Sequence, residues 1–134
     1  MLTHERPQQI GVIAKASGIP IKTIRYYEEI GLVQAIARTE GGYRLFGTDV
    51  LTRLSFIKRA QSLGLSLAEI KEFLEIHDQG NLPCDPIQVK LHDKLAEIDL
   101  QIEQLKILKS ELNGLLSDSV IPEYSSRVIC PILQ

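Results

Sequence analysis

The sequence is poor in cysteine and has no long apolar segment. Its 134 residues include two cysteines, Cys84 and Cys130. A small secreted domain held together by disulfides would contain more, so we expect a protein of the reducing cytoplasm. No apolar run approaches the length that spans a membrane, and no signal peptide opens the chain. These absences argue against a secreted or membrane protein.

The sequence also lacks the short motifs by which common enzymes are recognised. It contains no glycine-rich phosphate loop, no nucleophile elbow and no paired carboxylates in a recognisable setting. We therefore expect a protein that acts by binding and is not an enzyme.

Charged residues are present in ordinary amount but are unevenly distributed. Residues 1–64 contain nine Lys and Arg against five Asp and Glu, a net charge of +4. Residues 65–134 contain six against twelve, a net charge of −6. The basic half indicates an anionic partner, and the acidic half indicates a different task.

The spacing of apolar residues predicts a mainly α-helical chain. Two short helices are expected within residues 8–18 and 19–31, since each apolar pattern ends at a glycine and a very short turn separates them. This arrangement is typical of a helix-turn-helix. Residues 32–46 roughly alternate between apolar and polar side chains around Gly41 and Gly42, which predicts a hairpin. Two more helices follow, one capped by Thr48 and one opened by a capping box of Ser66 and Glu69.

A long fifth helix is predicted to start with Asp85 as its N-cap and Pro86 as its first residue, directly after Cys84. Its apolar residues repeat at heptad spacing, and the helix is too long for the remaining small domain to cover. We therefore expect it to form a coiled-coil dimer. The heptad residues are Leu91, Leu95, Ile98, Ile102, Leu105 and Leu112.

The second short helix contains the run Arg25-Tyr26-Tyr27. Helical spacing places Lys22, Arg25, Tyr26 and Glu29 on one exposed face, whereas Tyr27, like Ile21 and Ile24, falls nearer the opposite, packed face. Guanidinium and phenol groups both donate hydrogen bonds to phosphate oxygens. A solvated face with arginine stacked on tyrosine would be a simpler explanation. The preceding turn, the basic surroundings and a second pair, Tyr43-Arg44, favour a DNA-binding helix.

Over its whole length the sequence resembles the MerR family of bacterial transcription regulators. The family's helix-turn-helix is similar to residues 10–33, IGVIAKASGIPIKTIRYYEEIGLV. Its wing is similar to residues 37–46, ARTEGGYRLF, and its fourth helix to residues 63–74, LGLSLAEIKEFL. The resemblance implies a winged helix-turn-helix joined to an antiparallel coiled-coil dimer. The implied domains are residues 1–80 for DNA binding with connecting helices, 81–117 for dimerisation and 118–134 for a C-terminal metal-binding loop or tail.

The same resemblance implies which residues meet double-stranded promoter DNA. They lie on the recognition helix and in the wing, and most should contact phosphates, which position a protein without specifying sequence. Members of this family distort an over-long promoter spacer so that RNA polymerase can engage both promoter elements, and a twofold dimer is suited to this. The implied residues are Lys22, Thr23, Arg25, Tyr26, Arg38, Tyr43 and Arg44.

The cysteines are candidate ligands for a soft metal ion. Cys84 stands at the predicted start of the long helix, where the partial positive charge favours a thiolate. By resemblance, Cys84 and Cys130 match the first and last cysteines of the family's metal sensors, which bind ions between the start of the dimerisation helix and the loop after it. The middle cysteine of the mercury and zinc members is missing, and Gly114 stands near its place.

This departure leaves several ions open. Two thiolates suit linear Hg(II) or Cu(I), whereas Zn(II) or Cd(II) would need further ligands, for which His77, His92, Asp118 or Glu123 are available. The family's copper(I) sensors lack a cysteine at the position of Cys84, so Hg(II), Zn(II), Cd(II) or Pb(II) are favoured over Cu(I).

The sequence is also compatible with functions other than metal sensing. A lone cysteine is most often a small buried hydrophobe, and the same pair could instead form a regulatory disulfide in a thiol-redox regulator. A regulator of small molecules would append a sizeable ligand domain after the coiled coil, which the short tail opposes. A dimeric module without DNA binding is opposed by the basic half.

Overall fold

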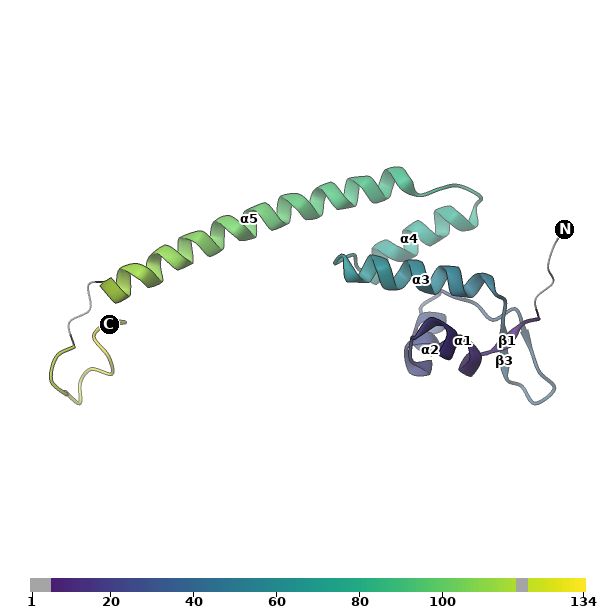
Figure 1. The fold of residues 1–134 in the computed structure, drawn as a ribbon, viewed down its shortest axis with the longest axis horizontal. Helices are drawn as coiled ribbons and strands as arrows, with labels where there is room; N and C mark the ends of the chain where they lie inside the picture. The colour runs from purple at the N-terminus through teal and green to yellow at the C-terminus, as the bar shows by residue number, and fades with distance from the viewer. Residues whose placement is uncertain (1–5, 118–120) are drawn as a thin grey trace. The chain divides into compact units, whose positions relative to one another are not determined.

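The computed structural model describes residues 6–117 and 121–134 (Figure 1). Contacts divide the chain into two units, Met1–Lys90 and Leu91–Gln134. The domain boundaries drawn from the sequence stay predictions, and part of the last one, residues 118–120, falls outside the described residues.

The first unit begins with two short helices, α1 (Ile10–Ser17) and α2 (Ile21–Glu29). Gly18 ends α1 with φ 73° and donates its N–H to the carbonyl of Ala14, a left-handed cap that glycine adopts without strain. Two residues then lead into α2, which confirms the helix-turn-helix. Tyr27 is buried at 6% exposure and Tyr26 is exposed at 49%, as the helical spacing predicts.

One residue of α2 departs from the expected pattern. The sequence places Ile21 nearer the packed face, whereas the structure leaves it exposed. Ile21 begins the helix, and a side chain in the first turn is directed back beyond the helix start, where no preceding turn covers it.

A small antiparallel sheet follows, with strand order β1-β3-β2. β2 (Ala37–Arg38) and β3 (Arg44–Phe46) form the predicted hairpin, with Arg38 opposite Arg44. β1 (Gln8–Gln9) pairs with the other edge of β3, Gln8 opposite Phe46. The sequence predicts a single hairpin and does not predict this third strand. Two polar residues carry no strand pattern, and their pairing depends on the free edge that β3 offers.

Two further helices complete the first unit, α3 (Asp49–Ser62) and α4 (Leu67–Asp78). Thr48 is the N-cap of α3, although its side chain makes no capping hydrogen bond. The capping box at α4 is formed as predicted, with Ser66 Oγ accepting from Glu69 N–H at 3.1 Å and Glu69 Oε1 accepting from Ser66 N–H at 2.9 Å. The helices enclose one apolar core. Its fully buried members are Ile13, Ile24, Leu32, Val33, Phe46, Leu54, Ile57, Ile70 and Phe73.

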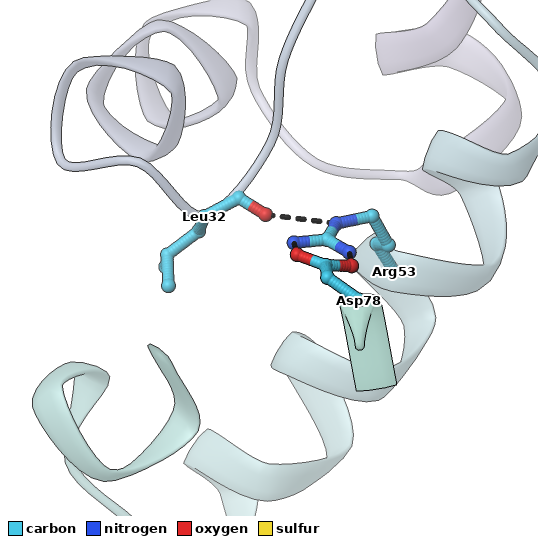
Figure 2. Close-up of polar contacts among 3 residues, drawn as sticks. All are labelled: Leu32, Arg53 and Asp78. Carbon is cyan, nitrogen blue, oxygen red and sulfur yellow. Dashed lines mark hydrogen bonds and ion pairs between the residues drawn. The ribbon is translucent and has the colours of Figure 1, made fainter. Parts of the chain in front are cut away.

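Arg53 of α3 links three parts of this unit (Figure 2). Its Nε donates to the carbonyl oxygen of Leu32 at 2.9 Å, just after the helix-turn-helix. Its terminal nitrogens contact the carboxylate of Asp78, the last residue of α4, at 2.5 and 3.4 Å. The arginine therefore joins the segment just after the helix-turn-helix to both α3 and α4.

Helix α5 (Cys84–Ser117) begins in the first unit and makes up most of the second. Its start differs from the prediction, because Cys84 is the first helical residue and Asp85 lies inside the first turn. The carbonyl of Pro83 already accepts the N–H of Ile87, so the helical hydrogen bonds begin before Asp85. The predicted heptad residues from Leu95 to Leu112 are all exposed in the single chain. Across the described residues, no helix is both long and apolar enough to cross a membrane.

Candidate nucleic-acid interface

The outward face of α2 presents the side chains that the sequence singles out for DNA. Lys22, Arg25 and Tyr26 are exposed and Thr23 is half-buried. The opposite face of α2 packs against the rest of the first unit, and there the hydroxyl of Tyr27 donates to Gln61 Oε1 on α3 at 2.6 Å. Burial raises the pKa of this hydroxyl above its ordinary value, so Tyr27 stays a neutral donor.

The turn of the wing is held by its own polar groups. Thr39 Oγ1 accepts the N–H of Tyr43 at 3.1 Å, and Arg38 Nη1 donates to the carbonyl of Gly42 at 3.3 Å. Gly42 has φ 84°, a left-handed conformation that glycine adopts without strain. The turn thus leaves the side chain of Tyr43 exposed beside α2.

The structure brings three of the predicted DNA-binding residues together. Arg25 of α2, with Tyr43 and Arg44 of the wing, lines a small hollow whose other walls are Gln9, Ile10 and Gly42. Two guanidinium groups and a phenol around one hollow form a surface suited to a phosphate group. Lys22, Thr23, Tyr26 and Arg38 do not line this hollow.

Sequence reasoning missed Glu28, which forms an ion pair with one of the arginines of this surface. Its Oε1 lies 2.8 Å from Arg44 Nε, and this ion pair joins α2 to β3. The side chains are 20% and 45% exposed for Glu28 and Arg44. No local spacing could have identified this pair, because it forms only when the wing folds against α2.

The two cysteines lie in different units. Cys84 is exposed at the start of α5 and lines a largely apolar cavity of about 460 Å³, together with His77 and the aromatic side chains of Phe56 and Phe73. Cys130 is partly buried in the tail, and its backbone N–H donates to Gln134 Oε1 at 3.1 Å.

No cluster of three or more His, Cys, Asp and Glu side chains suited to a metal occurs within residues 6–117 and 121–134. His77 lines the cavity beside Cys84, while His92 and Glu123 belong to the second unit. Asp118, another predicted extra ligand, lies outside the described residues. A site in the described part of a single chain therefore has at most two such side chains close together.

The fold and this surface define a winged helix-turn-helix protein with basic and aromatic side chains on one face. The family model described as "MerR HTH family regulatory protein" matches residues 9–75, and the one described as "MerR, DNA binding" matches residues 51–115. The chain belongs to the MerR family of helix-turn-helix transcription regulators, whose members found in the comparison are regulators rather than enzymes.

Similar proteins include metal regulators. The mercuric resistance operon regulatory protein of Bacillus cereus is 36% identical over 126 residues, covering 94% of each chain. The solved structure of the regulator PbrR691 from Ralstonia metallidurans CH34 in complex with lead(II) matches with a TM-score of 0.76 and 31% identity, covering 94% of this chain and 96% of that one. HiNmlR, a MerR family regulator lacking the sensor domain and bound to promoter DNA, matches with a TM-score of 0.55 and 28% identity, covering 81% and 83%.

Proposed function

We propose that this protein is a metal-responsive transcription regulator that binds a twofold promoter operator as a homodimer. The observation that carries the proposal is the hollow that Arg25, Tyr43 and Arg44 line. It brings together side chains that can donate hydrogen bonds to a phosphate, from two elements that are distant in sequence. The similarity of the chain to a regulator bound to promoter DNA and to a regulator in complex with lead(II) supports the same function.

In this proposal α2 enters the major groove and the wing follows the neighbouring backbone. Lys22, Thr23, Arg25 and Tyr26 contact DNA from α2, and Arg38, Tyr43 and Arg44 contact it from the wing. Each cation that neutralises a phosphate releases counterions, which makes binding dependent on salt. Phosphate contacts of this kind position the dimer, and deformability of the promoter adds to its selectivity.

Dimerisation is assigned to α5, which would pair antiparallel with its counterpart. Ile98, Ile102, Leu105 and Leu112 are 44% to 63% exposed in the single chain. A stripe of apolar residues at heptad spacing is stable in water when a partner helix covers it. The resulting twofold axis matches a twofold operator. The dimer would then hold both ends of the operator while RNA polymerase binds the promoter.

The donor atoms of this chain fit a soft metal ion. Cys84 offers an exposed sulfur, Cys130 a partly buried one, and His77 lines the cavity that Cys84 borders. Sulfur ligands select soft ions, and Hg(II), Zn(II), Cd(II) or Pb(II) is the signal we propose. Cu(I) is less favoured because the family's copper(I) sensors lack a cysteine at the position of Cys84. When bound, the ion would join Cys84 to Cys130 and so favour one arrangement of the dimer over another, which is the differential interaction that a switch requires.

Metal titration of the fully reduced protein tests this function. Elemental analysis should find a soft ion, and binding should release protons and mask thiols to chemical counting. Cys84→Ser and Cys130→Ser should each abolish metal-dependent transcription with purified RNA polymerase while leaving promoter binding intact. A double serine variant that still responds to metal would refute the site. Activation by an oxidant in the absence of metal would establish the thiol-redox regulator instead.

A further inference from the structure

We propose that Glu28 is a positioning residue that holds Arg44 ready for a DNA phosphate. This inference rests on the proposed DNA-binding function and adds a residue to it. Glu28 belongs to α2, and Arg44 is the first residue of β3, the central strand of the sheet. Their 2.8 Å ion pair therefore fixes the wing arginine from the recognition helix itself.

The atoms used in this pair leave the guanidinium free to act. Glu28 Oε1 faces Nε of Arg44 in the ion pair, and among the described residues no side-chain hydrogen bond or further ion pair of Arg44 is found. Its two terminal nitrogens therefore retain their N–H groups for a phosphate, in the fork geometry that suits planar recognition of such anions. Arg25 lines the same hollow, so the pair sets the place of one guanidinium beside the other.

Limiting the rotamers of Arg44 in the free protein should raise its affinity for DNA. An unrestrained arginine samples many rotamers, and ordering one at an interface weakens binding by a few-fold to about tenfold. Glu28 limits those rotamers in the free protein. Its side chain is also less exposed than that of Arg44, at 20% against 45%, so the arginine is the more accessible partner of the pair.

An opposite effect must be weighed, because a carboxylate near DNA repels phosphates. Removing Glu28 would strengthen binding if repulsion dominated and would weaken it if positioning dominated. Glu29 provides a matched control, since it is the next residue of the same helix, is exposed and has no ion pair among the described residues. Glu29→Ala removes the same charge without releasing Arg44.

The test uses the full-length reduced protein and the DNA duplex that the wild type selects from a randomised pool. Dissociation constants are measured across salt concentrations for Glu28→Ala, Glu28→Gln, Glu29→Ala, Arg44→Ala and the double variant Glu28→Ala/Arg44→Ala. Urea unfolding confirms that each variant is folded. Glu28→Ala should weaken binding about three- to tenfold, and Glu28→Gln, which keeps the size of the side chain but removes the charge of the ion pair, should lose most of the same affinity.

The salt slope distinguishes positioning from loss of charge. Arg44→Ala should lower the slope by about one unit, whereas Glu28→Ala should leave it unchanged because Arg44 is still present. In the Arg44→Ala background, removal of Glu28 should weaken binding no further. Glu28→Ala that tightens binding as Glu29→Ala does, or that weakens it equally with Arg44 absent, would overturn the proposal. A wild type that selects no duplex, or an unchanged slope in Arg44→Ala, would instead refute the DNA-binding surface on which it rests.

Discussion

Arg53 should be among the most important polar residues for the stability of the first unit. Its side chain is 17% exposed, and its guanidinium reaches both the Leu32 carbonyl and the Asp78 carboxylate. Arg53→Ala would remove both contacts and leave that carbonyl, on a fully buried residue, without its donor. The two contacts are unequal, since Asp78 is 53% exposed and water can replace its partner.

The expected magnitude follows from these environments. A hydrogen bond from a charged donor to a shielded carbonyl contributes about 1.5–3 kcal/mol, whereas an ion pair with an exposed carboxylate contributes at most about 1 kcal/mol. Arg53→Ala should therefore lower the free energy of unfolding by about 2–3 kcal/mol. Asp78→Asn should lower it by less than about 1 kcal/mol.

Urea unfolding followed by circular dichroism, at fixed protomer concentration, measures these differences. Arg59→Ala is the control, since Arg59 lies on the same helix, is exposed and has no ion pair among the described residues. It should change stability by less than about 0.5 kcal/mol. An Asp78→Asn variant as unstable as Arg53→Ala would refute the reasoning, because the exposed pair would then dominate.

Three further predictions concern assembly, pH and DNA. Replacing Leu95 and Ile102 with Asp should give monomers by analytical ultracentrifugation, and a wild type that is already monomeric at micromolar concentration would contradict the heptad assignment. The raised pKa of Tyr27 means that its hydroxyl stabilises the fold below about pH 10 and that this contribution is lost as pH rises through the raised pKa. Tyr27→Phe should cost about 1 kcal/mol at neutral pH and flatten the alkaline decline, as urea unfolding at several pH values would show. Arg25→Ala should weaken promoter binding and lower its salt slope by about one unit, and an unchanged slope would remove Arg25 from the interface.

Local patterns predicted the helices because local chemistry forms them. The capping box of Ser66 and Glu69 needs only residues three apart, and the opposite fates of Tyr26 and Tyr27 follow from helical geometry. The start of α5 was predicted two residues late, since Asp85 and Pro86 suit a cap but equally suit the first turn that they occupy.

Contacts between residues that are distant in the sequence could not be predicted from local patterns. Strand β1 forms only because β3 offers an edge, and the pairing of Glu28 with Arg44 or Arg53 with Leu32 joins residues that no periodicity connects. The candidate DNA residues were predicted by type and by resemblance, but the grouping of three of them, Arg25, Tyr43 and Arg44, around one hollow was not. Their roles, and those of Cys84 and Cys130, stay predictions for the experiments above.

The junction between β1 and α1 has a further consequence for how the protein engages its target. Gln9 is at once the last residue of β1 and the N-cap of α1, so no intervening loop separates the sheet from the helix pair. A wing free to swing would lose conformational entropy each time it settled on DNA. Here that ordering is completed when the chain folds. A substitution that loosens this junction, such as Gln9→Gly, should therefore weaken DNA binding, both through the junction and through the hollow that Gln9 lines.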